Sequence, residues 1–198
     1  MEYSKEDHKH FAIYKPYGVL SQFKSNDSKQ QSKRFLSSLY NFPPGIMAIG
    51  RLDEKSEGLL LLTTSGKVSD FINSRKVEKE YYAQIDGHIS ECAIEELKQG
   101  VEIGIEGKKY RTKPCKVHKL SEAPQLPERS KKIRDDRHGP TSWVSITLRE
   151  GKFRQVRKMT SAVGYPTLRL VRVRVGNMNL DAMKVGEVKL IDDYSFIP

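Results

Sequence analysis

The carboxylate of Asp53 stands in a charged loop directly before four consecutive leucines, residues 59–62. Arg51 precedes it by two positions and Lys55 follows it by two. A carboxylate can attack an electron-poor carbon or act as a base, and the end of a rigid strand fixes such a group well. A turn or a local salt bridge also explains an isolated loop aspartate, and this stretch alone favours that structural role.

A second candidate site is the stretch EGKFRQVRKM at residues 150–159. Gly151 permits a tight turn from a strand into a helix. Lys152 and Arg154 would then lie near the helix N-terminus, where the helix dipole disfavours cations and favours an anion such as phosphate. The alternative is a solvated basic helix face.

The third candidate is Tyr81, in the sequence KEYY that begins at Lys79. A strand tyrosine can stack on a nucleic-acid base, although it more often packs in a core. The five histidines and two cysteines show no metal-ligand spacing, and the sequence has no P-loop and no dinucleotide-binding glycine motif. We therefore expect no metal site, and chemistry that depends on carboxylate, arginine and tyrosine.

The charge balance predicts a polyanionic partner. Lysine and arginine number 35 against 25 aspartates and glutamates, a net charge of +10, although charge alone does not distinguish RNA from DNA or a membrane surface. No apolar run is long enough to cross a membrane, and the polar start MEYSKEDHKH lacks the apolar centre of a signal peptide. We expect a cytoplasmic protein without a membrane partner.

Strands and helices alternate without a regular βαβ repeat, which predicts an α+β domain on a large, mainly antiparallel sheet. We expect strands within residues 10–15, 46–50, 58–64, 78–87, 108–120 (at a sheet edge), 141–150 and 167–180. We expect helices within residues 28–40, 66–75, 90–100 and 152–164, the last with Phe153 on its apolar side. Residues 121–140, with three prolines and nine charged residues, predict an exposed basic loop.

Taken together, these stretches resemble the RsuA-type pseudouridine synthases, which isomerise selected uridines in ribosomal RNA. The matching motifs are KPYGVLSQF, GRLDEKSEGLLLLTTSGK, KEYYAQIDG and EGKFRQVRKMTSAVGYPTLRLVRVRVGNMNL, in the family's order. The resemblance implies the pseudouridine synthase fold: a mixed, mainly antiparallel sheet flanked by helices, with a central RNA-binding cleft. It also implies a polar tail at residues 1–9 and one catalytic domain at residues 10–198, with two subdomains sharing one sheet. No cofactor is implied, since the reaction is an isomerisation.

The resemblance assigns roles to four residues. Asp53 matches the essential aspartate, and Arg51 matches the arginine that displaces the target nucleotide and occupies its space. Tyr81 matches the tyrosine that stacks on the target base, and Arg157 the basic residue that pairs with the aspartate. An RNA substrate further implies RNA-binding residues outside this set, for which we expect Lys15, Lys79, Lys152, Arg154, Gln155, Arg129, Arg134 and Arg137.

Family members usually carry an S4 RNA-binding domain before the catalytic domain, and only about nine residues precede the first expected strand here. We therefore expect the branch without that domain, which acts on 23S ribosomal RNA. We also expect a monomer, since no amphipathic helix is left without a core to pack against. Two local departures from the family are TTSG in place of TNDG, and Phe153 in place of Asn.

Two other functions remain open from the sequence. A glycoside or nucleoside hydrolase would need a second carboxylate as acid, for which Glu54 and Glu57 are the only candidates close in sequence. A catalytically silent RNA-binding or ribosome-assembly factor is disfavoured because all four catalytic positions are filled. The sequence also leaves open whether the aspartate attacks C1′, adds to the base, or acts through a glycal.

Overall fold

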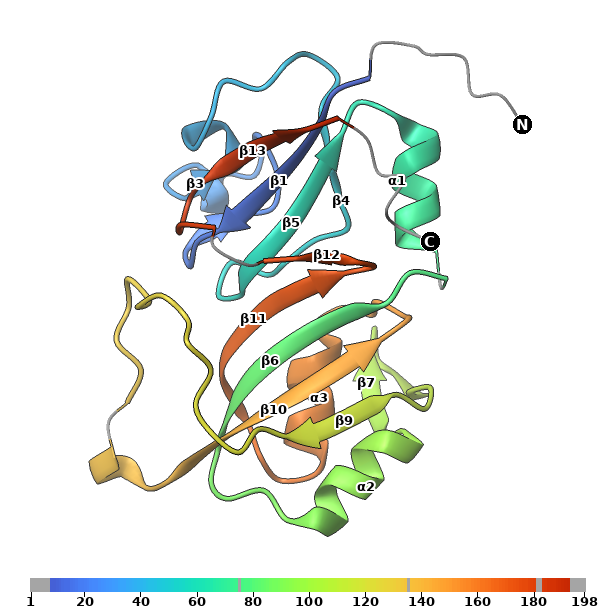
Figure 1. Cartoon of the computed structure of the whole chain (residues 1–198), viewed down its shortest axis with the longest axis vertical. Coiled ribbons are helices and arrows are strands. Elements are labelled where there is room, and N and C mark those ends of the chain that lie inside the picture. The colour runs from blue at the N-terminus through green and yellow to red at the C-terminus, as the bar shows by residue number, and fades with distance from the viewer. Residues whose placement is uncertain (1–7, 75, 135, 181–182, 193–198) are drawn as a thin grey trace.

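One large mixed sheet runs through the computed structural model, which describes residues 8–74, 76–134, 136–180 and 183–192 (Figure 1). The strand order is β13-β1-β5-β11-β6-β10-β9, with β4 paired to β5 and β12 to β11. Among the described strand pairs of this sheet, only β5–β11 is parallel. The strands are β1 His10–Lys15, β4 Met47–Ile49, β5 Glu57–Thr63, β6 Lys79–Asp86, β9 Lys116–Lys119, β10 Thr141–Leu148, β11 Thr167–Val175, β12 Met178–Asn179 and β13 Val188–Ile191.

Helices and two small sheets flank this sheet, so the predicted α+β class is confirmed. In Figure 1, α1 lies beside the upper half of the sheet, and α2 and α3 lie with its lower half. The hydroxyls of Ser65 and Ser90 cap α1 and α2. The elements are α1 Gly66–Asn73, α2 Glu91–Gln99 and α3 Gln155–Ala162, with the strand pairs β2 Val19–Leu20 with β3 Arg34–Phe35, and β7 Glu102–Ile105 with β8 Lys108–Arg111.

The four leucines of β5 pack into apolar clusters on both faces of the strand. Leu59 and Leu61 belong to one apolar cluster and Leu60 and Leu62 to another, on opposite faces of the strand. All four are at most 1% exposed. The strand is therefore buried on both sides, as the continuous apolar run predicts.

Three local predictions are wrong. Residues 28–40 do not form an α-helix: two short 3-10 turns, Ser28–Gln30 and Leu36–Ser38, flank β3, which pairs with β2. The apolar residues of this segment gather at its end, so no continuous helical face exists to bury. Residues 108–120 form two strands, β8 and β9, in different sheets, although β9 does lie at a sheet edge as expected. Phe153 precedes α3 and is 68% exposed, so it is not on that helix's apolar side.

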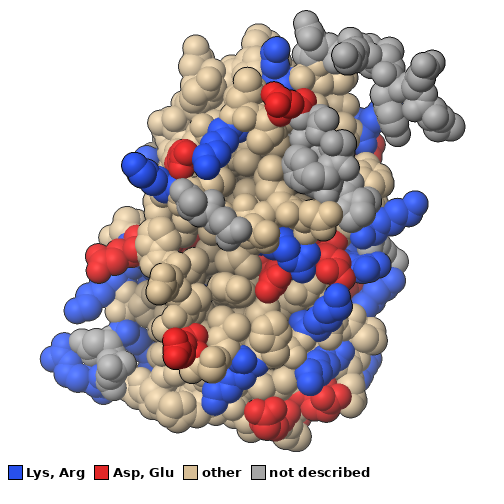
Figure 2. Space-filling model, viewed as in Figure 1, with Lys and Arg blue, Asp and Glu red and all other residues tan. Residues whose placement is uncertain are grey.

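The basic loop at residues 121–140 is largely exposed, as predicted, with a 3-10 turn at Asp136–His138. Figure 2 shows lysine and arginine side chains gathered at the lower left of the molecule, where this loop protrudes in Figure 1.

The seam between the two halves of the sheet is the short parallel contact of β5 with β11. Only two residue pairs form it, Glu57 with Val171 and Gly58 with Arg172. Gly58 has a φ of 105°, and a Cβ there would lie 2.3 Å from the backbone oxygen of Arg172. Because that neighbour is backbone and cannot move away alone, only glycine fits at this position.

Replacing Gly58 with alanine should therefore destabilise the fold by about 3 kcal/mol, through backbone strain and a steric clash together. Thermal unfolding followed by circular dichroism measures this as a lower Tm. Gly45→Ala is the matched control, because Gly45 also has a positive φ but a Cβ there would meet no atom within 4 Å. Equal losses from both substitutions would show that the contact with Arg172 is not the constraint.

Candidate active site

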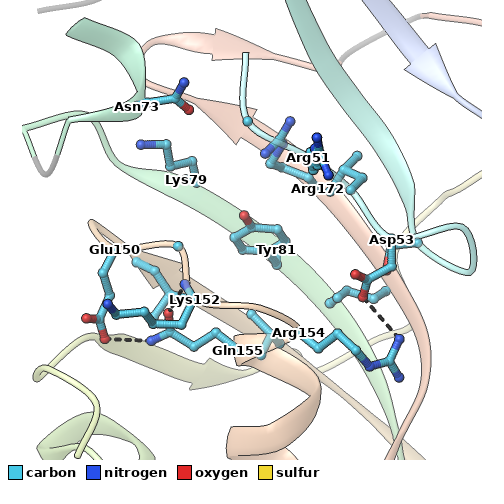
Figure 3. A pocket seen from close by; sticks show the side chains of 17 residues that line it. Arg51, Asp53, Asn73, Lys79, Tyr81, Glu150, Lys152, Arg154, Gln155 and Arg172 are labelled. Carbon is cyan, nitrogen blue, oxygen red and sulfur yellow. Dashed lines mark hydrogen bonds and ion pairs between the residues drawn. The ribbon is translucent and has the colours of Figure 1, made fainter. Parts of the chain in front are cut away.

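A cavity of about 400 Å³ opens beside this seam (Figure 3). Its walls come from the loop before β5, from β6, from the loop before α3 and from β11. The sequence analysis singled out the first three of these segments separately, and the fold brings them together. The labelled lining residues are Arg51, Asp53, Asn73, Lys79, Tyr81, Glu150, Lys152, Arg154, Gln155 and Arg172.

Ser21 fixes the backbone of the loop that carries Asp53. Its hydroxyl donates to the carbonyl of Leu52 at 2.7 Å and accepts from the amide of the same residue at 3.0 Å. The Leu52 side chain is buried, while Arg51 is exposed and Asp53 is half-buried. Because the Ser56 amide donates to the Asp53 carbonyl at 2.9 Å, the turn after the aspartate is closed as well.

A buried ion pair anchors the same loop where it enters β5. Arg169 of β11 donates to both carboxylate oxygens of Glu57, at 3.0 and 3.1 Å, and both side chains are less than 10% exposed. Removing one partner of such a pair costs about 3–5 kcal/mol. Arg169 also donates to the carbonyl of Pro127 at 2.7 Å, which ties the loop at residues 121–140 to the same point.

The carboxylate of Asp53 lies close to two arginines, Arg154 directly before α3 and Arg157 within it. Arg154 Nη1 lies 3.3 Å from Asp53 Oδ2, and Arg157 Nε lies 3.9 Å from the same oxygen. Arg154 is the residue before α3 and has left-handed backbone geometry, with φ of 54°. The family resemblance implies Arg157 as the partner of the aspartate, and in the structure Arg154 is the nearer of the two.

The guanidinium of Arg157 donates mainly to backbone carbonyl groups, one of them in the loop that carries Asp53. Its Nη2 donates to the carbonyl of Lys55 at 2.8 Å, and its Nη1 donates to the carbonyl of Thr167 at 3.2 Å. Burial, and next the charge of Arg154, lower the pKa of Arg157 from its usual value, while Asp53 opposes the change. The guanidinium therefore braces the loop after the aspartate as well as facing its carboxylate.

The ring of Tyr81 lies within the cavity, between Arg51 and Arg172 on one side and Lys152 and Arg154 on the other (Figure 3). It is half-buried and packs against apolar clusters of both halves of the sheet. The ring therefore forms part of the wall of the cavity.

The family model described as RNA pseudouridylate synthase matches residues 9–162. The chain belongs to this family. It is similar to proteins named ribosomal large subunit pseudouridine synthase E: 42% identical to one from Xanthomonas axonopodis pv. citri, covering 86% of this chain and 87% of that protein, and 39% identical to one from Xanthomonas campestris, covering 91% and 94%. A crystal structure titled as a pseudouridylate synthase matches with a TM-score of 0.71 and 26% identity, over 95% of this chain and 72% of that one. The predicted enzyme class, an isomerase that converts uridine to pseudouridine in RNA, is confirmed.

Lys15 was expected to hold a phosphate of the RNA, and its burial contradicts that role. Its side chain is fully buried, and its Nζ donates to the carbonyl of Pro16 at 2.9 Å. Burial lowers the pKa of Lys15 to about 7, against the opposing charges of Glu57 and Asp53. The residue lies inside the synthase, beneath the aspartate loop, where an RNA backbone cannot reach it.

Two further residues expected to bind RNA line the cavity with their polar groups already engaged. Lys79 Nζ donates to the carbonyls of Ile72 and Val77, at 2.8 and 3.0 Å, at the end of α1, and burial lowers its pKa to about 8. Gln155 accepts from the amide of Lys152 at 2.9 Å and donates to Glu150 at 2.5 Å. Both brace the walls of the cavity.

The remaining expected RNA-binding residues divide between the cavity and the loop at residues 121–140. Lys152 lines the cavity, with its Nζ 4.9 Å from the centre of the Tyr110 ring. The guanidinium of Arg129 lies 4.7 Å from the centre of the Tyr17 ring, and Arg134 forms an ion pair with Asp86. Arg137 is exposed in the 3-10 turn. None of the three loop arginines lines the cavity, and their contact with RNA stays a prediction.

Two groups that shape the cavity were not predicted from the sequence. Arg172 of β11 is 4% exposed and donates from Nε to the carbonyl of Leu59 at 2.7 Å, while its Nη2 has no hydrogen-bond partner among the described residues. An arginine within the valine-rich sequence of β11 is the signal that could have identified it. Glu150 accepts from the Tyr110 hydroxyl at 2.6 Å and from the Lys113 amide at 2.9 Å. Burial would raise the pKa of Glu150, but these bonds and that of Gln155 lower it.

None of the helices within the described ranges has the length and apolar character needed to span a membrane. In the same part of the chain, no group of three or more His, Cys, Asp or Glu side chains is arranged to hold a metal ion.

The lowered pKa of Lys15 gives a stability difference that depends on pH. Between pH 7 and pH 10 the unfolded chain holds a proton on Lys15 that the folded chain has released, so folding becomes more favourable as the pH rises. Lys15→Met removes this contribution. Its free energy of unfolding, measured by urea denaturation, should fall relative to wild type by up to about 1.4 kcal/mol per pH unit in that range. The exposed Lys67→Met is the control, and a pH-independent difference for Lys15→Met would contradict a neutral buried amine.

Proposed function

We propose that this pseudouridine synthase isomerises a specific uridine of 23S ribosomal RNA, with Asp53 as its catalytic carboxylate. The observation that carries the proposal is the position of Asp53, at the edge of a cavity of about 400 Å³, within 4 Å of two arginines and near a tyrosine ring. The names of its relatives support the large ribosomal subunit as the source of the RNA. We further propose that the enzyme is cytoplasmic and monomeric.

The reaction exchanges one bond for another within the nucleotide. The N1–C1′ bond breaks, the uracil turns over, and C5 joins C1′, while the proton of C5 is lost and N1 takes one up. An ionised carboxylate suits this change because it can attack C1′, add to the base or remove a proton from the sugar. No electrons are gained or lost, so the chemistry requires no redox cofactor.

Arg51 and Tyr81 would handle the nucleotide before and during this step. A uridine must leave its stack to reach the cavity, at a cost of a few kcal/mol. Arg51 is exposed at the mouth of the cavity, where its guanidinium can take the place of the departed base. Tyr81, on the rigid strand β6, offers its ring to the displaced uracil.

The two arginines near Asp53 would have different tasks. Arg157 is 11% exposed and holds the loop backbone, so we assign it to orientation of the aspartate. Arg154 is 38% exposed and lies at the helix N-terminus, so an RNA phosphate can compete with Asp53 for its guanidinium. Lys152 and the arginines of the loop at residues 121–140 would hold further phosphates.

The engagement of the nearby glutamates counts against the hydrolase alternative. A retaining or inverting hydrolase needs a second carboxyl group free to act as acid. Both oxygens of Glu57 accept from Arg169, and Glu54 forms an ion pair with Lys33 at 2.6 Å. Neither carboxylate lines the cavity, and Glu150, which does line it, accepts hydrogen bonds from Tyr110, Lys113 and Gln155.

Replacing Asp53 with asparagine keeps the shape of the side chain and removes its charge. Tritium release from 5-tritiated uridine in 23S ribosomal RNA should fall by at least about a thousandfold, since the catalytic carboxylate is lost. Affinity for the RNA, measured by filter binding, should change less than about threefold. Asp70→Asn, at an exposed position on α1, is the control.

Undiminished tritium release by the Asp53→Asn enzyme would rule out Asp53 as the catalytic group. Release of free uracil by wild type would instead identify a hydrolase. Pseudouridine mapping in 23S and 16S RNA from cells with and without the gene would test the choice of RNA.

A further inference from the structure

Phe153 is exposed at a place where the surrounding residues are cations. Its side chain is 68% exposed, the largest exposed fraction among the large apolar residues that the structure describes as exposed. Lys152 and Arg154 flank it in sequence, and the Nζ of Lys158 lies 5.1 Å from the centre of its ring. Lone exposed apolar residues are common, but a ring with one lysine against it and two more cations beside it in sequence is suited to a ligand that is both flat and anionic.

The backbone that carries Phe153 is fixed from both ends. The Gln155 amide donates to the Lys152 carbonyl at 3.0 Å, and the Lys152 amide donates to the Gln155 side chain at 2.9 Å. Gln155 is in turn held by Glu150. Because these bonds close the turn around residue 153, the ring is mounted on a rigid support and loses little entropy when a ligand stacks on it.

Two hollows meet at the next residue along the chain. Arg154 lines the catalytic cavity and also a second hollow of about 490 Å³, which Arg157 and Lys158 line from α3. Lys158 is held in place because its Nζ also donates to the carbonyl of Gly104 at 2.7 Å. A strand of RNA that places its target in the first hollow and continues into the second would pass Phe153.

We propose that Phe153 stacks on the base of a nucleotide that neighbours the target uridine. This inference rests on the proposed function, since it takes the RNA as the substrate of the catalytic cavity. Stacking on an aromatic ring serves any base, because every base presents a flat π-face, and Lys152 and Arg154 are placed to meet the adjoining phosphates. An apolar protein partner fits less well, since charged residues are depleted at the centre of protein interfaces.

The test measures binding apart from catalysis. In the Asp53→Asn background, a 23S ribosomal RNA transcript is bound to proteins with Phe153 unchanged or replaced by Ala, Leu or Trp. The Ala and Leu variants should raise the Kd about 5- to 150-fold, and Trp should keep or improve the affinity. The slope of log Kd against log salt should stay that of the parent, because no ionic contact is lost.

Matched controls separate stacking from other effects. Phe71→Ala removes an exposed phenylalanine on α1 whose sequence neighbours Asp70 and Ile72 line neither hollow, unlike Lys152 and Arg154 beside Phe153, and it should leave the Kd unchanged. Arg154→Ala should reduce the salt slope as well as the affinity. With Asp53 present, Phe153→Ala should raise KM for tritium release with little change in kcat.

An unchanged Kd for a folded Phe153→Ala protein would overturn the proposal and favour a protein partner as the ligand of the ring. A Leu variant that binds as well as the parent would overturn stacking in favour of a general apolar contact. Tritium release that survives Asp53→Asn would contradict the proposed catalytic role, and the binding series would still report on Phe153 separately.

Discussion

The short parallel contact between β5 and β11 is the constraint on which the rest of the molecule depends. It is made by two residue pairs, and at one of them the two backbones approach so closely that a side chain is excluded at Gly58. The other residue pair is Glu57 with Val171, and the buried ion pair between the Glu57 side chain and Arg169 fixes the start of β5 there. Because Asp53 lies just before β5 and Arg172 lies on β11, this one seam determines how the halves of the active site face each other.

Around this seam, most of the polar groups of the cavity serve to hold loops rather than to meet the substrate. Ser21 fixes the peptide groups of Leu52, and Gln155 with Glu150 fixes the turn before α3. Such bracing leaves a small set of exposed side chains in the cavity wall, among them Arg51 and Arg154. Preorganised groups of this kind stabilise developing charge without first having to reorganise.

The sequence allowed the fold class, most strands and the three stretches that line the cavity to be predicted, because each depends on local pattern, such as the leucines in series of β5 and the glycines at the turns. It did not allow the environment of single side chains to be predicted. Lys15 looks like any lysine of a basic protein, and its burial follows from strands distant in sequence. The choice between Arg154 and Arg157 as nearer neighbour of Asp53 depends on a left-handed residue before α3, which no periodicity reveals.

Arg169 serves two acceptors, the carboxylate of Glu57 and the carbonyl of Pro127. If the loop at residues 121–140 moved away, a buried N–H would lose its acceptor, at a cost of about 1–3 kcal/mol. The loop and the strand that follows Asp53 thus share one donor, which links their free energies even though they are far apart in sequence. By reciprocity, an interaction that strengthens the hydrogen bond from Arg169 to Pro127 also changes the free energy with which Arg169 anchors Glu57 of β5.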